Sequence, residues 1–306
     1  RGHHVTGIDN FDAFYGRAVK ERNLASIGPG ARFFEGDLLD VPFVDRVLGE
    51  RRYDAIVHLA ALAGVGPSLK APARYQRVNV EGTATLAEAC VRHGIPTMVF
   101  ASSSSVYGAN TKVPFEEGDR VDDPMSPYAA SKRAAELVLR SAQLTTGLGV
   151  TALRYFTVYG PRQRPDMAIH KFCKAIDRGE PIRLTGGEHS SRDYTFVSDI
   201  VEGTVAAIES AGPGYRIYNL GGSKATTLGE LVAYLGKAHP EERPAIYMRM
   251  GAIQVETGDA RASLATMDTA QAMLDQGLWK DYRDDIGAVT GEALVLLGDC
   301  AGGLRR

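Results

Sequence analysis

Short runs of apolar and β-branched residues alternate with longer stretches of helical periodicity through the first half of the chain. The runs expected to form strands are Val5–Asp9, Ala31–Phe34, Ala55–Leu59, Thr97–Ser102 and Val150–Phe156. The stretches expected to form helices are Arg17–Ser26, Val41–Glu50, Pro72–Arg92 and Tyr128–Thr146. Single strands that alternate with helices build βαβ units, whose strands are parallel. The sequence therefore predicts an α/β fold with a doubly wound parallel sheet.

After about residue 160 this alternation becomes irregular, because prolines interrupt the stretch 161–182. A further short strand is expected at Asp193–Val197, and Thr227 and Glu230 have capping-box spacing in front of an apolar helix. We expect a smaller mixed α/β lobe here, over the carboxyl ends of the parallel strands, where open α/β sheets bind ligands. The expected boundaries are a first domain over 1–165, to which 190–220 returns, and a lobe over 166–189 and 221–306.

The charge balance excludes partners that need a strong electrostatic field. Lys and Arg number 35 and Asp and Glu 37 among 306 residues, a formal net charge of −2, so no global field would attract nucleic acid or an anionic membrane. No apolar run approaches the ~18–20 residues that span a bilayer, and the first residues form no hydrophobic signal core. We therefore expect a cytoplasmic protein without nucleic-acid or membrane partners.

The three cysteines, Cys90, Cys173 and Cys300, predict no metal site. Cys90 lies close to His93, and Cys173 lies close to His170. Neither pair has nearby the second pair of ligands that a zinc site needs. Buried structural thiols are the expected interpretation of these residues.

Asp9 is the last residue of the first expected strand. A carboxylate there can accept both hydroxyls of an adenosine ribose and favours NAD over NADP, although a turn or cap aspartate is an equally ordinary interpretation. In dinucleotide-binding folds this acid follows a glycine-rich phosphate loop by ~20 residues, and neither G-x-G-x-x-G nor G-x-x-G-x-x-G occurs in the chain. We expect that strand and loop, roughly 20–25 residues, upstream of residue 1, and weak NAD binding by this chain.

Tyr128 and Lys132 stand four residues apart in an expected helix, so both lie on one face. An ammonium group stabilises a neighbouring phenolate and lowers the pKa of the tyrosine, which makes it a usable general base near neutral pH. An exposed pair on an amphipathic helix would have the same spacing. The serines of 102–105 follow an expected strand, and their hydroxyls can bind a reacting sugar hydroxyl or belong to a polar loop.

These features belong to a longer series of ordered motifs. The series comprises Gly7-Ile8-Asp9-Asn10, Gly36-Asp37-Leu38, His58-Leu59-Ala60-Ala61, Asn79-Val80-Glu81-Gly82-Thr83, the serine block, Tyr128 with Lys132, Arg154–Pro161 and Ser191-Arg192-Asp193-Tyr194. Over roughly residues 1–270 the chain resembles the extended short-chain dehydrogenase/reductase family, the NAD-dependent nucleotide-sugar epimerases and dehydratases. The resemblance implies a Rossmann-like first domain that binds NAD, a lobe that binds the UDP-sugar, and a homodimer. From about Trp279 onward there is no family likeness.

The resemblance also implies a role for each matching position. Ser103 would be the catalytic hydroxyl, Tyr128 the base and Lys132 its partner. The positions implied for the cofactor are Asp9, Asn10, Asp37, Leu38, Leu59, Ala60, Ala61, Asn79, Tyr128, Lys132 and Tyr155. Those implied for the substrate are Ser104, Ser105, Thr157, Arg164, Arg192 and Asp259. Asp37 is equally interpretable as a helix-start aspartate, and the arginines as solvated surface charges.

The reaction follows from a few of these positions. Relatives that dehydrate or decarboxylate their substrate resemble one another in having an acidic residue just before the Val-Tyr-Gly of the serine block. This chain has Ser104 and Ser105 at those positions, so the resemblance favours epimerisation. The segments 15–24 and 156–166 resemble the UDP-glucuronate 4-epimerase branch, and Thr157 with an arginine can bind a carboxylate. The implied reaction converts UDP-glucuronate to UDP-galacturonate through a 4-keto intermediate. A UDP-glucose/UDP-galactose 4-epimerase and a non-catalytic nucleotide-sugar or NAD-binding protein remain open.

Overall fold

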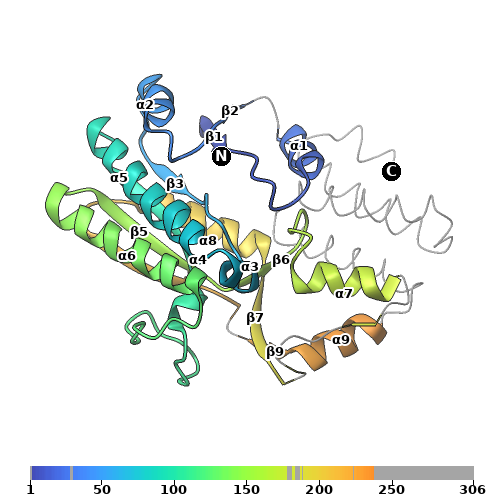
Figure 1. Cartoon of the computed structure of the whole chain (residues 1–306). Helices are drawn as coiled ribbons and strands as arrows, with labels where there is room; N and C mark the ends of the chain where they lie inside the picture. The colour runs from blue at the N-terminus through green and yellow to red at the C-terminus, as the bar shows by residue number, and fades with distance from the viewer. Residues whose placement is uncertain are drawn as a thin grey trace. The chain divides into compact units, whose positions relative to one another are not determined.

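β4 (Thr97–Ser103) and β5 (Gly149–Tyr155) are the central strands of the fold, and every residue of each except the last is buried. Such continuous burial is typical of parallel strands covered on both faces. The structure is a computed structural model (Figure 1). It describes residues 2–27, 30–177, 181–182, 187, 189–222 and 224–237. The chain divides into two compact units, residues 1–157 with 200–223, and 158–199 with 224–306.

The first unit contains two groups of parallel strands. One has the order β3-β4-β5-β8, with β3 at Ile56–His58 and β8 at Tyr215–Leu220. The other pairs β1 (Val5–Asp9) with β2 (Ala31–Glu35). The predicted parallel sheet is thus confirmed in direction, but among the described residues it consists of two pieces, since β1 and β3 share no strand pairing.

Alternate residues of the central strands face different helices. Met98, Phe100, Val150 and Ala152 pack in one core with α2 (Val41–Gly49), α5 (Gly82–Arg92) and α6 (Pro127–Thr146). Val99 and Leu153 point to the other face and pack against the end of α8 (Val197–Glu209). Helices therefore cover both faces, as a doubly wound sheet requires.

The expected helices form, with one irregularity. α1 (Arg17–Ala25), α2 and α6 match their predicted ranges within two residues. The predicted helix 72–92 is instead three segments, which are α4 (Pro72–Gln76), a π-helical turn η1 (Arg77–Glu81) and α5, preceded by α3 (Val65–Lys70). A π turn inserts one residue into a helix and occurs often at functional sites.

The second unit is a smaller mixed α/β unit. Its sheet has the order β6-β7-β9, formed by Thr157–Tyr159, Ser191–Phe196 and Ala225–Thr227. α7 (Ala168–Asp177) and α9 (Leu228–Lys237) pack together through Phe172 and Leu231. β7 pairs antiparallel with β9, and this unit contains residues 158–199, whereas the expected boundaries assign 158–165 and 190–199 to the first domain.

The predicted capping box is confirmed at the start of α9. The amide of Glu230 donates to the hydroxyl of Thr227 over 3.1 Å, and the Glu230 carboxylate accepts from the Thr227 amide over 2.8 Å. Each residue satisfies a backbone donor that the first turn would otherwise leave unpaired. No helix in the described residues is both long enough and apolar enough to cross a bilayer.

Candidate active site

α6 carries the predicted base and its partner, and its start is fixed by local sequence. The hydroxyl of Ser126 accepts a hydrogen bond from the amide of Ala129 over 3.1 Å, and Pro127 occupies the first helical position. Gly147 ends the helix in a left-handed conformation that glycine adopts without strain. Tyr128 and Lys132 therefore lie one turn apart near the amino end of a rigid 20-residue helix, which packs against β4.

Lys132 is buried beneath the carboxyl end of β4. Its ammonium nitrogen donates to the carbonyl oxygen of Ala101 over 2.8 Å and lies 4.9 Å from the centre of the Phe100 ring. Burial lowers the pKa of Lys132 to about 8, and the negative charge of Glu136 opposes part of that shift. The group therefore loses its proton at a lower pH than an exposed lysine does.

Ser103 ends β4 and caps the short 3-10 turn η2 (Ser104–Tyr107). Its hydroxyl oxygen accepts from the amide of Ser105 over 3.2 Å and from the hydroxyl of Ser105 over 2.9 Å. The hydrogen of Ser103 serves neither of these bonds. α6 packs against both β4 and η2, so the structure brings the predicted Ser103, Tyr128 and Lys132 to the same end of the sheet.

Asn79 connects the loop after β3 to α6. Its side-chain oxygen accepts from the amide of Leu62 over 2.8 Å, and its nitrogen donates to the carbonyl of Leu62 and the hydroxyl of Ser131, each over 2.9 Å. This fully bonded side chain holds in place the preceding loop residues predicted to line the cofactor. Leu59 and Ala60 are exposed and Ala61 is half-buried.

The carboxyl ends of β1 and β2 carry a second group of predicted residues. Asp9 accepts from the amide of Phe11 over 2.6 Å, and Lys20 lies 3.4 Å from the same oxygen. Asn10 donates to Asp37 over 2.9 Å, which joins the ends of the two strands. Leu38, beside Asp37, packs against the core of the first unit.

Tyr155 and Thr157 follow from β5 into β6. The hydroxyl of Tyr155 shares a 2.8 Å hydrogen bond with Thr204 of α8, and burial raises the pKa of the phenol. In the structure this hydroxyl serves the packing of α8. Thr157 is half-buried as the first residue of β6.

The predicted substrate residues of the second unit stand on separate segments. Arg164 forms two 3.0 Å hydrogen bonds to the carboxylate of Asp166. Arg192, at the start of β7, is exposed and donates to the Ser190 hydroxyl over 3.0 Å. Asp259 lies outside the described residues.

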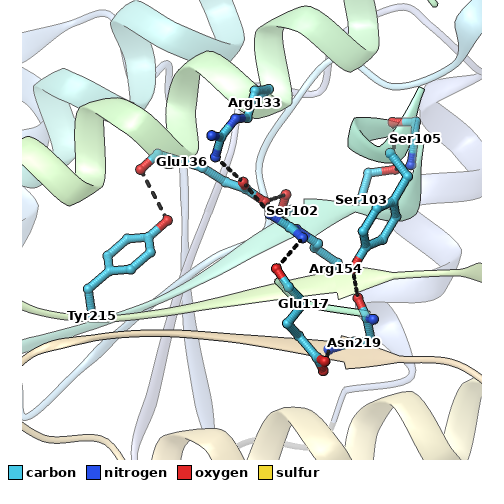
Figure 2. A network of polar contacts seen from close by, with 10 residues as sticks. Ser102, Ser103, Ser105, Glu117, Arg133, Glu136, Arg154, Tyr215 and Asn219 are labelled. Atoms are coloured by element: carbon cyan, nitrogen blue, oxygen red, sulfur yellow. Dashed lines mark hydrogen bonds and ion pairs between the residues drawn. The ribbon is translucent and has the colours of Figure 1, made fainter. Parts of the chain in front are cut away.

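A buried polar group that is not among the predicted site residues lies behind the site. Figure 2 shows Glu136 of α6 together with Ser102 of β4, Arg154 of β5 and Arg133 of α6, each of which donates a hydrogen bond to its carboxylate. Arg154 and Glu136 form a two-bond ion pair at 3.0 Å, and both are at most 1% exposed. Two features of the sequence could have indicated this ion pair. Glu136 continues the helix face of Tyr128 and Lys132 by one turn, and Arg154 is a charged residue in an otherwise apolar strand.

The chemistry of these side chains fits NAD. Asp9 is a half-exposed carboxylate at a strand end, which is the group that accepts ribose hydroxyls in dinucleotide-binding folds. Lys132 has three donor hydrogens, of which the Ala101 carbonyl takes one. Within the residues that the structure describes, no cluster of three or more His, Cys, Asp or Glu side chains could hold a metal ion.

Comparison with known proteins agrees with this arrangement. The NAD dependent epimerase/dehydratase family matches residues 1–221. UDP-glucuronate 4-epimerase 1 of Arabidopsis thaliana is 40% identical over 255 residues, which are 78% of this chain and 59% of that protein. UDP-glucuronate 4-epimerase of Thermodesulfobacterium geofontis is 39% identical over 225 residues, 73% of this chain and 69% of that protein. The chain belongs to the NAD dependent epimerase/dehydratase family.

Solved structures give the same relationship. UDP-glucuronic acid 4-epimerase from Bacillus cereus, in complex with UDP-glucuronic acid and NAD, superposes with a TM-score of 0.71 at 32% identity. The match covers 76% of this chain and 74% of that one. Against the Arabidopsis relatives, the chain spans only about three fifths of their length, 59% for the first of them.

Proposed function

We propose that this protein is an NAD-dependent 4-epimerase of a UDP-sugar, and that it converts UDP-glucuronate to UDP-galacturonate. The observation that carries the proposal is that Ser103 ends β4 and that the ammonium group of Lys132 is anchored on the nearby Ala101 carbonyl, with Tyr128 one turn before Lys132 on α6. The relatives named UDP-glucuronate 4-epimerase support the choice of substrate.

In this proposal the chain's own residues move one proton. Tyr128, as the phenolate, takes the proton of the C4 hydroxyl, and the Lys132 ammonium stabilises that phenolate. Ser103 hydrogen-bonds the reacting oxygen. NAD, when bound, supplies the acceptor for the C4 hydride and its return to the other face, so the cycle is redox-neutral. The sugar passes through a 4-keto intermediate, and as the hydride returns, the phenol of Tyr128 gives its proton back to the C4 oxygen, so that the sugar leaves with C4 inverted.

The cofactor residues of the proposal are those at the ends of β1, β2 and β3, with Asn79 as the support of the β3 loop. Their positions at strand ends suit ligand binding in an open α/β sheet. The first unit is then the NAD-binding unit, and the second unit binds the UDP-sugar, with Arg192 on the diphosphate. Tyr155 would contact the cofactor through its ring, because its hydroxyl is bonded to Thr204.

The preference for a uronate rests on the substrate carboxylate. Thr157, Arg164 and the hydroxyls of Ser104 and Ser105 are proposed to bind it and to keep the C5–carboxylate bond out of alignment with the C4 ketone, so that the β-keto acid keeps its carbon dioxide. Arg164 already holds a carboxylate, that of Asp166. A uronate carboxylate would take the place of Asp166 on this two-bond edge of the guanidinium.

The test is incubation of the chain with NAD and UDP-glucuronate, followed by chromatographic separation of the nucleotide sugars. UDP-galacturonate is the expected product. Conversion of UDP-glucose alone would move the function to a 4-epimerase of neutral hexoses. NAD binding without any product from either sugar would identify a binding protein and overturn the proposal.

We also propose a homodimer in the cytoplasm. Support for the dimer comes from exposed apolar side chains on α5 and α6, since Val91, Leu137 and Leu144 are 45%, 54% and 67% exposed. Apolar side chains exposed on neighbouring helices are typical of protein interfaces. Sedimentation equilibrium of the chain measures the oligomeric state directly, and a monomer at all concentrations would contradict the proposal.

A further inference from the structure

Glu136 lies one helical turn beyond Lys132 on α6 and is fully buried. Its carboxylate accepts four hydrogen bonds. Ser102 donates over 2.6 Å, Arg154 donates twice over 3.0 Å, and Arg133 donates over 3.1 Å. A buried carboxylate is tolerated only with such partners, because its desolvation is expensive. The Glu136 carboxylate is therefore held inside the layer between α6 and the sheet by its pairing with Arg154 and Arg133.

The strand register explains why Glu136 can contact two strands at once. Ser102 of β4 is directly opposite Arg154 of β5, so both side chains project from the same face of the sheet, the face that α6 covers. Glu136 bonds both of them (Figure 2). The residue before Ser102 is Ala101, which accepts from Lys132, and the residue after it is Ser103.

Three consecutive residues at the end of β4 thus have different roles: Ala101 binds Lys132, Ser102 binds Glu136, and Ser103 is the predicted catalytic hydroxyl. α6 is attached to the end of β4 through Lys132 at Ala101 and through Glu136 at Ser102. These two attachments set how Ser103 stands relative to the helix that carries Tyr128. The arrangement couples the geometry of the site to a charge that lies behind it.

The charged and titratable groups around Lys132 come from several elements. His58 of β3 is neutral, because burial and the Lys132 charge lower its pKa to about 3. Tyr128 lies on α6 itself, and Tyr75 of α4 packs edge-on against the Tyr128 ring. Glu136 raises the pKa of Lys132 against the effect of burial. The cations Arg154 and Arg133 face Glu136.

We propose that Glu136 is a positioning residue for the epimerisation: held by Ser102 and Arg154 one turn beyond Lys132 on α6, its carboxylate stabilises the Lys132 ammonium group in place on the Ala101 carbonyl. This inference rests on the proposed function for its role in catalysis. The electrostatic effect of Glu136 on Lys132 is a property of the folded chain and can be measured without turnover.

The experiment is a titration of Lys132 by carbon NMR, in protein isotope-labelled at the lysine ε-carbon. The Lys132 signal is the one that Lys132→Arg removes. Glu136→Gln keeps the size of the side chain and one of its two acceptor oxygens and removes its charge, so we expect the pKa of Lys132 to fall by about one unit or more. Arg154→Lys keeps the charge but loses the two-bond geometry. It is the matched control and should lower the melting temperature while leaving the Lys132 titration in place.

A purely structural role for Glu136 gives a different result. In that case Glu136→Gln and Arg154→Lys would both lower stability and neither would move the titration of Lys132, which overturns the proposal. If Glu136→Gln alone does not fold, the double variant Glu136→Gln/Arg154→Gln removes the ion pair without leaving one charge buried. A fall in the Lys132 pKa is then expected from Arg154→Gln to the double variant, because that comparison removes only the charge of Glu136, and no fall contradicts the proposal.

Kinetics separate this inference from the proposed function. In wild-type protein kcat should decrease as pH rises through the pKa of Lys132. Glu136→Gln should shift that decrease to lower pH by the same number of pH units as the change in the Lys132 pKa measured by NMR, and KM for UDP-glucuronate should stay unchanged. A decrease that stays in place while the NMR titration moves would overturn the catalytic role. Absence of turnover in wild type would reject the proposed function, whereas the titration would still decide the role of Glu136 toward Lys132.

Discussion

The imidazole Nε2 of His58 lies 2.9 Å from the hydroxyl oxygen of Thr83, between β3 and α5. The hydroxyl of Thr83 donates its hydrogen to the carbonyl of Asn79 over 2.6 Å. Thr83 can therefore only accept from His58, which fixes the neutral ring with its hydrogen on Nε2. The burial of this ring and the charge of Lys132 hold the pKa of His58 at about 3.

This neutral histidine should make the protein sensitive to acid. Below pH 6.5, the ordinary pKa of histidine, the unfolded chain binds a proton at His58 and the folded chain does not. The free energy of unfolding therefore decreases as the pH is lowered from 6.5 towards 3. Relative to His58→Gln, which can donate to Thr83 without titrating, wild type should lose about 1.4 kcal/mol of unfolding free energy per pH unit between about pH 6 and pH 4. Urea unfolding of both proteins across that range measures it, and parallel curves would contradict the assignment.

Replacing either member of the helical pair should abolish most turnover. Tyr128→Phe removes the proton acceptor, and Lys132→Met removes the ammonium group, so we expect kcat for UDP-glucuronate to fall by about 10²–10⁴-fold in each variant. Circular dichroism controls for folding. More than about a tenth of wild-type kcat in Tyr128→Phe would show that another group takes the proton.

Arg164→Ala should discriminate between substrates. Loss of a charge-assisted contact to the uronate carboxylate should lower kcat/KM for UDP-glucuronate by about 10- to 100-fold, with a much smaller effect on UDP-glucose. Asp166→Asn is the control, because it removes the present partner of Arg164 but leaves the guanidinium. Equal losses on the two sugars would exclude Arg164 as the carboxylate ligand.

Asn79→Ala should loosen the loop after β3. It leaves the amide and carbonyl of Leu62 without their partner, and a buried unpaired polar group costs about 1–3 kcal/mol. Ser131→Ala removes a single bond of the same side chain and should cost less. Thermal unfolding ranks the two variants, and hydrogen exchange at Leu62 should be faster in Asn79→Ala. Unchanged exchange there would disprove the bracing role.

Periodicity predicts most of the first unit because its elements are decided locally. β1, β4 and β5 are apolar runs bounded by turns, and their observed limits differ from the predicted ones by at most one residue. α6 has its cap, its first-turn proline and its terminal glycine in the sequence. The unit to which β7 belongs differs from the expected domain boundary, because its antiparallel pairing with β9 joins residues 191–193 to 225–227, a contact between distant residues that no local pattern encodes.

The site was predictable where one element carries the spacing. Tyr128 and Lys132 are four residues apart on one helix, and the serines end one strand. The role of Glu136 was not predictable in this way, because it depends on the β4–β5 register that sets Ser102 opposite Arg154. The pairing of Arg164 with Asp166 and that of Tyr155 with Thr204 likewise depend on side-chain packing.

The π turn η1 makes the length of one segment critical. Asn79 lies within it, between α4 and α5, which both pack on α6. A chain one residue shorter here would form a regular helix, but every side chain before the deletion would rotate by about 100° relative to those after it. Tyr75 could then no longer face Tyr128 while Thr83 faces His58. A single-residue deletion, harmless in a surface loop, would here break either the contact of Tyr75 with Tyr128 or that of Thr83 with His58.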